Sequence, residues 1–260
     1  MNFFDLFNKK HTVDSSERIP ESAMTHNSVD VKSDDNQHFE SNLDNKPKAS
    51  SIQKVHNLII LDESGSMEAI FKAALTGVNE TLQTIREAQK ENSNQVHFVS
   101  LVTFNSSRYN AIYMDEEANS TQDISKNQYR PRACTPLYDA MGHSITELRS
   151  NVKKGDIVLV TVITDGYENA SREYNGTAIK ALVMELKAQG WVFTYIGANQ
   201  DVVAVASSMS IDNHFGFGAD EESTGDMFEK ENRCRKRFFN KASRSVDFDN
   251  LGEGYFEENN

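Results

Sequence analysis

Residues 58–67 read LIILDESGSM, an unbroken apolar run followed by a carboxylate and two hydroxyls at alternate positions. A short run without polar interruption is typical of a strand that is buried on both faces of a sheet. The polar residues come where this strand ends and a helix begins, so the side chains of Asp62, Ser64 and Ser66 can converge. Gly65 lets the turn tighten and permits backbone angles that are costly for other residues. The stretch therefore predicts a central strand that brings three oxygen ligands to the edge of a sheet.

Strands and helices alternate after this stretch. The spacing of apolar residues predicts a helix over residues 67–89. Residues 96–104 and 109–114 are predicted to form two antiparallel strands, because the turn between them is too short for a parallel crossover. The remaining predicted elements are a helix from Pro136 to about residue 151, a strand over 157–163, a helix through 179–186 that ends at Gly190, a strand over 191–196, a helix over 201–209, an edge strand over 214–217 and a helix over 222–243. This order indicates an α/β fold with helical crossovers on an open sheet.

A second carboxylate, Asp165, follows the predicted strand 157–163, and Thr135 precedes a helix in the stretch TPLYDA. Ligands of open α/β sheets bind outside the carboxyl ends of the strands, where both residues are expected. The candidate metal ligands are Asp62, Ser64, Ser66, Thr135 and Asp165. Such hard oxygen ligands select Mg²⁺, Mn²⁺ or Ca²⁺, and we predict Mg²⁺ with Mn²⁺ as a substitute. A simpler interpretation, that Asp62 and Ser64 only cap the next helix, leaves the distant Thr135 and Asp165 unexplained.

The ordered set of D-x-S-x-S, a distant Thr and a distant Asp resembles the metal-ion-dependent adhesion site of the von Willebrand factor A-type domain. The resemblance covers about residues 55–217 and includes the TPLYDA stretch and the Thr-Asp-Gly strand end. It implies a Rossmann-like, doubly wound sheet of about six strands in the order 3-2-1-4-5-6, with one antiparallel strand. It also implies that Ser64 and Ser66 ligate the metal directly, that Asp62 and Asp165 act directly or through water, and that Thr135 joins when a partner binds. An intracellular member of bacterial or phage type is the expected kind of protein.

Two positions near the predicted ligands carry less information. Cys134 stands where related sequences often have glycine, which puts the backbone freedom of that loop in question; we expect a small buried side chain there. Glu63 occupies the variable position of the motif, and we expect its side chain to be solvated.

Several of the predicted ligands are neutral hydroxyls, so a bound cation would keep positive charge and an exchangeable water. An Asp or Glu of a partner protein could replace that water, which predicts a metal-dependent protein-interaction module rather than an enzyme. The alternative is a hydrolase that acts on a phosphoester with the same metal. It needs a general base or a second metal, and neither accompanies the motif in sequence, so no catalytic residue is predicted.

The chain of 260 residues has a formal net charge of -12, which argues against general affinity for nucleic acid or anionic membranes. Four basic residues fall on one side of the last predicted helix, within residues 233–244, namely Arg233, Arg237, Lys241 and Arg244. They could meet a phosphate or an acidic partner, but a solvated helix face is the preferred interpretation. No apolar run is long enough to cross a bilayer.

The composition divides the chain into three parts. Residues 1–54 are predicted to be disordered, residues 55–245 to form the α/β domain, and residues 246–260 to form a flexible acidic tail. Residues 3–10 could form a short helix that docks to a partner or contacts a membrane surface, but a frayed terminus without a role is the preferred interpretation. The basic residues of this stretch lie on the wrong side for a signal peptide. Only two cysteines occur, Cys134 and Cys234, which supports no disulfide framework and favours a cytoplasmic location.

Overall fold

The computed structural model describes residues 52–245 and 250–257. Its strands form one mixed sheet in the order β3-β2-β1-β4-β5-β6, in which only the β2–β3 pair is antiparallel. The strands are β1 (Gln53–Asp62), β2 (Gln95–Asn105), β3 (Arg108–Glu117), β4 (Ile157–Thr164), β5 (Val192–Ala198) and β6 (Asn213–Phe217). The predicted strand order, with one antiparallel strand at an edge, is confirmed.

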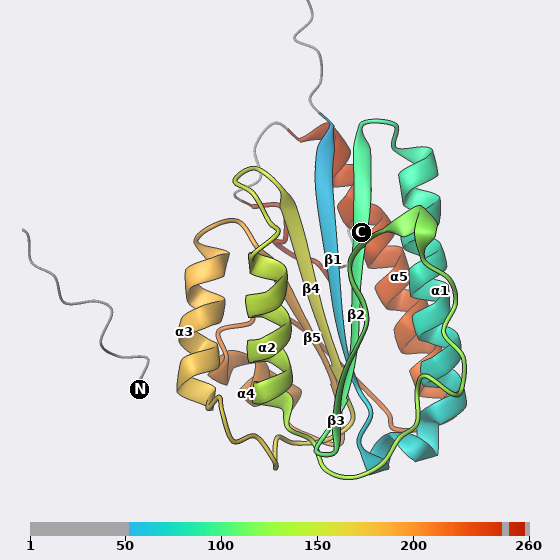
Figure 1. Ribbon diagram of the computed structural model, residues 1–260, viewed down its shortest axis with the longest axis vertical. Helices are drawn as coiled ribbons and strands as arrows, with labels where there is room; N and C mark the ends of the chain where they lie inside the picture. The colour runs from blue at the N-terminus through green and yellow to red at the C-terminus, as the bar shows by residue number, and fades with distance from the viewer. Residues whose placement is uncertain (1–51, 246–249, 258–260) are drawn as a thin grey trace, which may run out of the picture. The chain divides into compact units, whose positions relative to one another are not determined.

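Helices cover both faces of this sheet (Figure 1). They are η2 (Gly65–Ile70), α1 (Phe71–Glu91), η3 (Ala118–Ser120), α2 (Leu137–Arg149), α3 (Gly176–Lys187), α4 (Val202–Ser208) and α5 (Glu221–Arg244). Figure 1 shows α1 and α5 on one face and α2, α3 and α4 on the other. The expected helix from residue 67 begins instead as a 3-10 turn, and the α-helix starts only at Phe71.

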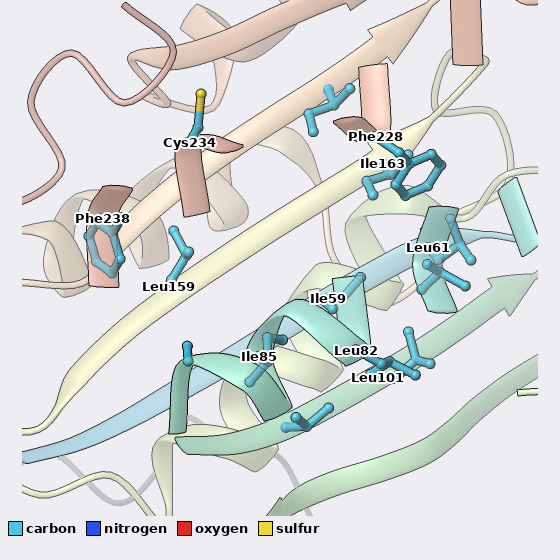
Figure 2. Packing of buried hydrophobic residues seen from close by; sticks show 14 of the residues in the cluster. Ile59, Leu61, Leu82, Ile85, Leu101, Leu159, Ile163, Phe228, Cys234 and Phe238 are labelled. Carbon is cyan, nitrogen blue, oxygen red and sulfur yellow. The ribbon is translucent and has the colours of Figure 1, made fainter. Parts of the chain in front are cut away.

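Each face of the sheet has its own apolar core, because successive side chains of a strand point to opposite faces. In β1, Ile59 and Leu61 join the core beneath α1 and α5, whereas Leu58 and Ile60 join the core beneath α2 and α3. Figure 2 shows the first of these cores, with Phe228 of α5 close to the strand side chains. The central strand is thus buried on both faces, as its apolar run predicts.

The helices α1 and α5 pack closely. A β-carbon at Gly77 of α1 would overlap the ring of Phe228 of α5, so glycine is needed there for the approach of the two helices. The same core holds a charged pair that the sequence did not single out. Arg235 of α5 is 0% exposed, lies 2.7 Å from Glu231 Oε1 and donates a hydrogen bond to Thr161 Oγ1 of β4.

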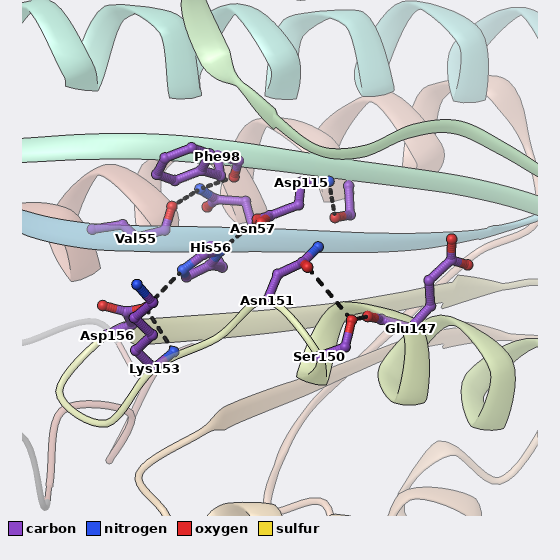
Figure 3. Close-up of polar contacts among 11 residues, drawn as sticks. Val55, His56, Asn57, Phe98, Asp115, Glu147, Ser150, Asn151, Lys153 and Asp156 are labelled. Atoms are coloured by element: carbon purple, nitrogen blue, oxygen red, sulfur yellow. Dashed lines mark hydrogen bonds and ion pairs between the residues drawn. The ribbon is translucent and has the colours of Figure 1, made fainter.

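Polar side chains tie the strands together at the end of the sheet opposite to the candidate ligands (Figure 3). His56 of β1 contacts Asp115 Oδ1 through Nδ1 at 2.5 Å and Asp156 Oδ2 through Nε2 at 3.3 Å. Its ring stacks on Phe98 of β2 with centroids 5.2 Å apart. Asp115 has a φ of 54° and lies within the irregular pairing of β2 with β3, and its carboxylate contacts His56.

The prediction of a loose C-terminal tail is wrong for residues 250–257. This segment was expected to be loose, but Leu251 is 5% and Tyr255 4% exposed within the core of α1 and α5. The basic stripe of α5 was expected to be solvated, and Arg233, Lys241 and Arg244 are indeed exposed. Arg237, however, is half-buried and donates to the carbonyl of Tyr255 at 2.7 Å, and Lys241 donates to that of Asn250 at 2.9 Å. The packing of the segment and the contacts of Arg237 and Lys241 have one cause, because an irregular segment can pack only if other groups satisfy its carbonyl oxygens.

Predictions for the first part of the chain fall outside the described residues. These include the membrane-contact peptide at residues 3–10 and all of the disordered segment up to residue 51. Among the residues that the structure describes, no helix is both long and apolar enough to cross a bilayer.

Candidate metal centre

The carboxyl ends of β1 and β4 bring four of the five predicted ligands into one hydrogen-bonded chain. The Ser64 and Ser66 hydroxyl oxygens lie 3.1 Å apart, and the Ser66 hydroxyl donates to Asp165 Oδ1 at 2.6 Å. The backbone N–H of Ser64 donates to Asp62 Oδ1 at 2.7 Å. These contacts close a turn over the strand ends, so that hydroxyl and carboxylate oxygens share one small region.

Hydrogen bonds from two neighbouring side chains hold Asp62 in place. The hydroxyl of Thr164 donates to Asp62 Oδ2 at 2.6 Å, and the hydroxyl of Tyr129 donates to the carbonyl oxygen of Asp62 at 2.9 Å. Burial, with a smaller contribution from the nearby charge of Asp165, raises the pKa of Asp62 from 3.8 to about 6, although hydrogen bonds from Thr164 and Ser64 oppose this rise. Burial also raises the pKa of Asp165. The protein thus keeps two carboxylates where their negative charge is costly, and a bound cation would lower that cost.

Thr135, the fifth predicted ligand, lies in a loop that rests against this turn. Its side chain is buried, its N–H donates to Asn169 Oδ1 at 2.9 Å, and its carbonyl oxygen accepts from the N–H of Asn169 at 3.1 Å. Two residues earlier, the carbonyl of Ala133 accepts from the N–H of Gly65 at 3.0 Å. The backbone of Thr135 is therefore fixed between the loop after β1 and the loop after β4.

Glu63 of this candidate centre differs from the expectation, since its side chain is 1% exposed rather than solvated. Its Oε1 accepts from the N–H of Arg130, and its carbonyl oxygen accepts from the N–H of Arg132 at 2.9 Å and from Asn105 Nδ2 at 3.2 Å. Within the described residues its Oε2 is buried without a hydrogen-bond partner. Glu63 thus fastens the start of the Thr135 loop to the end of β1.

The expected backbone freedom lies at Ala133, not at Gly65. Ala133 has a φ of 64°, a left-handed conformation that is uncommon for a residue with a side chain. A β-carbon at Gly65 would lie 3.4 Å from the carbonyl oxygen of Ala133, so glycine serves the close approach of the two loops. Cys134 is exposed rather than buried, because Ser106 in the β2–β3 turn binds its backbone on both sides.

The chemistry of the donor set fits a hard divalent cation. Two carboxylates and three hydroxyls are all oxygen ligands, which suit Mg²⁺ or Mn²⁺ better than metals that prefer nitrogen or sulfur. Within residues 52–245 and 250–257, no three His, Cys, Asp or Glu side chains are grouped as metal ligands. A cation at the strand ends would therefore depend on the hydroxyls of Ser64, Ser66 and Thr135 as well as on the carboxylates.

The sequence matches the family model of the von Willebrand factor type A domain over residues 58–230. The chain belongs to this family. The match begins in β1 and ends within α5, so it contains every candidate ligand. The vWA domain is a common protein-interaction module, and the present vWA domain has the family's sheet.

Solved structures agree with this fold. The PilB minor pilin from Streptococcus sanguinis superimposes with a TM-score of 0.50 and 13% identity, covering 74% of this chain and 63% of that chain. The pilus adhesin SpaC from Lactobacillus rhamnosus GG gives a TM-score of 0.53 and 14% identity, covering 72% of this chain and 31% of that chain. The vWA domain thus spans less than two thirds of either protein, and at these identities the likeness concerns the fold alone. None of the curated proteins matches the sequence.

Proposed function

We propose that this vWA domain is a metal-dependent protein-interaction module that binds an Asp or Glu of a partner protein through Mg²⁺. The observation that carries the proposal is the hydrogen-bonded chain from Ser64 through Ser66 to Asp165, beside the buried carboxylate of Asp62. Nothing in a packed core requires two carboxylates to lie at neighbouring strand ends, and their raised pKa values show the cost.

In this proposal Ser64 and Ser66 bind the cation through their hydroxyl oxygens, and Asp62 and Asp165 neutralise its charge. Bound there, Mg²⁺ would supply a Lewis-acidic position that a carboxylate can occupy in place of water. Thr135 completes the set from its own loop, whose backbone Asn169 and Gly65 hold in place. Because three of the five side chains are neutral, the site favours an anionic ligand.

Calorimetric titration with Mg²⁺ and with Mn²⁺ tests whether the proposed ligands bind a divalent cation. Ser66→Ala should weaken binding at least tenfold, because it removes a ligand and the hydrogen bond to Asp165. Ser107→Ala, a change of the same kind at an exposed position of the β2–β3 turn, should leave binding unchanged. Affinity should also fall as the pH drops through about 6, because Asp62 must be ionised to bind. Equal affinities of the two serine variants would contradict the site.

Capture of partner proteins with and without a chelator tests whether the metal mediates protein binding. Thr135→Ala should leave the melting temperature within a few degrees and yet reduce the chelator-sensitive capture of partner proteins. A hydrolase, the alternative function, would instead show Mg²⁺-dependent turnover in a panel of phosphoesters, and Thr135→Ala would lower it. Capture that resists both the chelator and the substitution would contradict the interaction proposal.

We also propose that the protein acts in the cytoplasm, since Cys134 and Cys234 are both unpaired in the described structure. Fractionation of the source cells, with a specific antibody, tests this location.

A further inference from the structure

A pocket of about 710 Å³ adjoins the candidate metal centre. Its wall includes Cys134 and Pro136, the two neighbours of Thr135, and Asn169, which binds the Thr135 backbone. The other sides are formed by the β2–β3 turn, the first turn of α2 and the loop after β4. A peptide segment that places one side chain at Thr135 would therefore have its neighbouring residues over this pocket.

The pocket presents two guanidinium groups that face solvent rather than a protein partner. Arg108 and Arg172 both line it, and within the described part of the chain neither side chain forms a salt bridge or a hydrogen bond. The carboxylates of the pocket are already engaged. Asp139 accepts from the backbone N–H groups of residues 172–174, and Glu173 lies 3.2 Å from His143 Nε2.

The two arginines and the two carboxylates of the pocket have no net formal charge together, but the arginines have more free hydrogen-bonding groups than the carboxylates do. Both oxygens of Asp139 and one oxygen of Glu173 face partners within the protein, whereas the planar N–H donors of both arginines remain available to a ligand. Tyr109 and His143 add an aromatic wall, with ring centroids 5.8 Å apart. Guanidinium donors beside an aromatic surface bind carboxylates well, because two parallel N–H groups match the two oxygens.

We propose that this pocket is a second carboxylate subsite, so that the preferred partner segment is acidic and carries two carboxylates a few residues apart. One carboxylate binds at the metal centre, and the other meets Arg108 and Arg172. The inference rests on the proposed function and specifies its partner. The two carboxylates together raise the affinity of the segment, because binding of the first holds the second close to its site.

Binding of labelled synthetic peptides to the full chain tests the subsite. One probe is a Gly-Ser peptide with a single aspartate, and four others carry two aspartates separated by one to four residues. In Mg²⁺, we expect the best two-aspartate peptide to bind roughly five- to tenfold more tightly than the single-aspartate peptide. Fluorescence anisotropy measures all of these affinities.

Two double variants separate a local contact from a change of net charge. Arg108→Ser with Arg172→Ser should remove the advantage of the second aspartate and leave the single-aspartate peptide nearly unaffected. Lys153→Ser with Lys154→Ser removes the same charge from an exposed loop at the opposite end of the sheet, and it should preserve that advantage.

The outcomes distinguish the subsite from the metal proposal. If all peptides bind equally in Mg²⁺, or if both double variants lose the advantage alike, the subsite is overturned and the metal proposal stands. If no peptide binds in a Mg²⁺-dependent way, both are overturned. Sedimentation with Mg²⁺ adds one more outcome: a chelator-sensitive dimer that the arginine variant abolishes would assign the pocket to a second copy of this chain and overturn a separate partner.

Discussion

The hydroxyl of Ser66 donates to Asp165 at 2.6 Å and joins two residues that are 99 positions apart in the chain. The contact forms because β1 and β4 are parallel neighbours whose register pairs Leu61 with Ile163. Both strands therefore end at the same edge of the sheet, and the turns that follow them bring Ser66 and Asp165 into contact. The alignment of the core strands thus sets the geometry of the candidate metal centre.

Asp62→Asn is expected to stabilise the metal-free protein at neutral pH. The pKa of Asp62 is raised from 3.8 to about 6, so the folded protein holds this proton more tightly than the unfolded chain does. Its contribution to stability therefore falls as the pH rises from about 4 to 6 and stays low above that range. Asparagine carries no such charge, and the variant should gain at most about 3 kcal/mol at pH 7.5. Urea unfolding in a chelator measures the difference, which should shrink toward zero at pH 4; a variant less stable than wild type at pH 7.5 would contradict the cause given for the shift.

Glu63→Ala is expected to loosen the Thr135 loop without removing any proposed ligand. The substitution leaves the N–H of Arg130 without its acceptor, whereas Glu63→Gln keeps an oxygen that can accept the bond. Amide exchange over residues 130–135 should therefore speed up at least tenfold in the alanine variant and only slightly in the glutamine variant. The affinity for Mg²⁺ should weaken in the same order. Unchanged exchange in the alanine variant would show that the other backbone contacts hold the loop alone.

A pair of glycine substitutions tests the close packing of α1 and α5. Gly77→Ala should lower the free energy of unfolding by about 1–3 kcal/mol, because the added methyl group overlaps the Phe228 ring. Gly225→Ala, at a helical position of α5 with no neighbouring atom within 4 Å, should raise it by about 0.5–1 kcal/mol through helix propensity. Chemical denaturation compares the two. Opposite signs are required, and a gain at both positions would refute the tight approach.

The sequence predicts the sheet well because its signals are local. An apolar run such as 58–61 marks a buried strand, and short turns fix antiparallel pairing. The candidate metal motif names residues that are far apart in the sequence, and the structure joins four of them, Asp62, Ser64, Ser66 and Asp165, by hydrogen bonds. Glu63, Asn169 and Ser106 escaped prediction because they act through backbone contacts between strand ends distant in sequence. Such contacts leave no periodic pattern in the amino-acid sequence.

Arg235→Ala is expected to be among the most destabilising changes in the described domain. The arginine and its partner Glu231 are 0% and 1% exposed, so its loss leaves a carboxylate buried without a counter-charge. Breaking a buried pair in this way costs about 3–5 kcal/mol. The double variant Arg235→Met with Glu231→Leu removes both charges and should recover most of the loss in urea unfolding. A double variant as unstable as the single one would show that packing or the hydrogen bond to Thr161, not charge, dominates.

Deletion of residues 246–260 tests whether the C-terminal segment is packed on the domain or loose. Leu251 and Tyr255 are buried, and burial of a large apolar side chain contributes about 1.5–3 kcal/mol. Ordering the segment costs part of this gain, so we expect the deletion to lower the free energy of unfolding by about 1–3 kcal/mol. Tyr255→Phe removes only the hydroxyl, which donates to Glu231 at 3.1 Å, and should lower it by about 1 kcal/mol. Because the segment covers α5 and not the strand ends, Mg²⁺ affinity should be unchanged in both variants. A deletion variant as stable as the full chain would restore the interpretation of a loose tail, and the cationic contacts of Arg237 and Lys241 would then contribute nothing to stability.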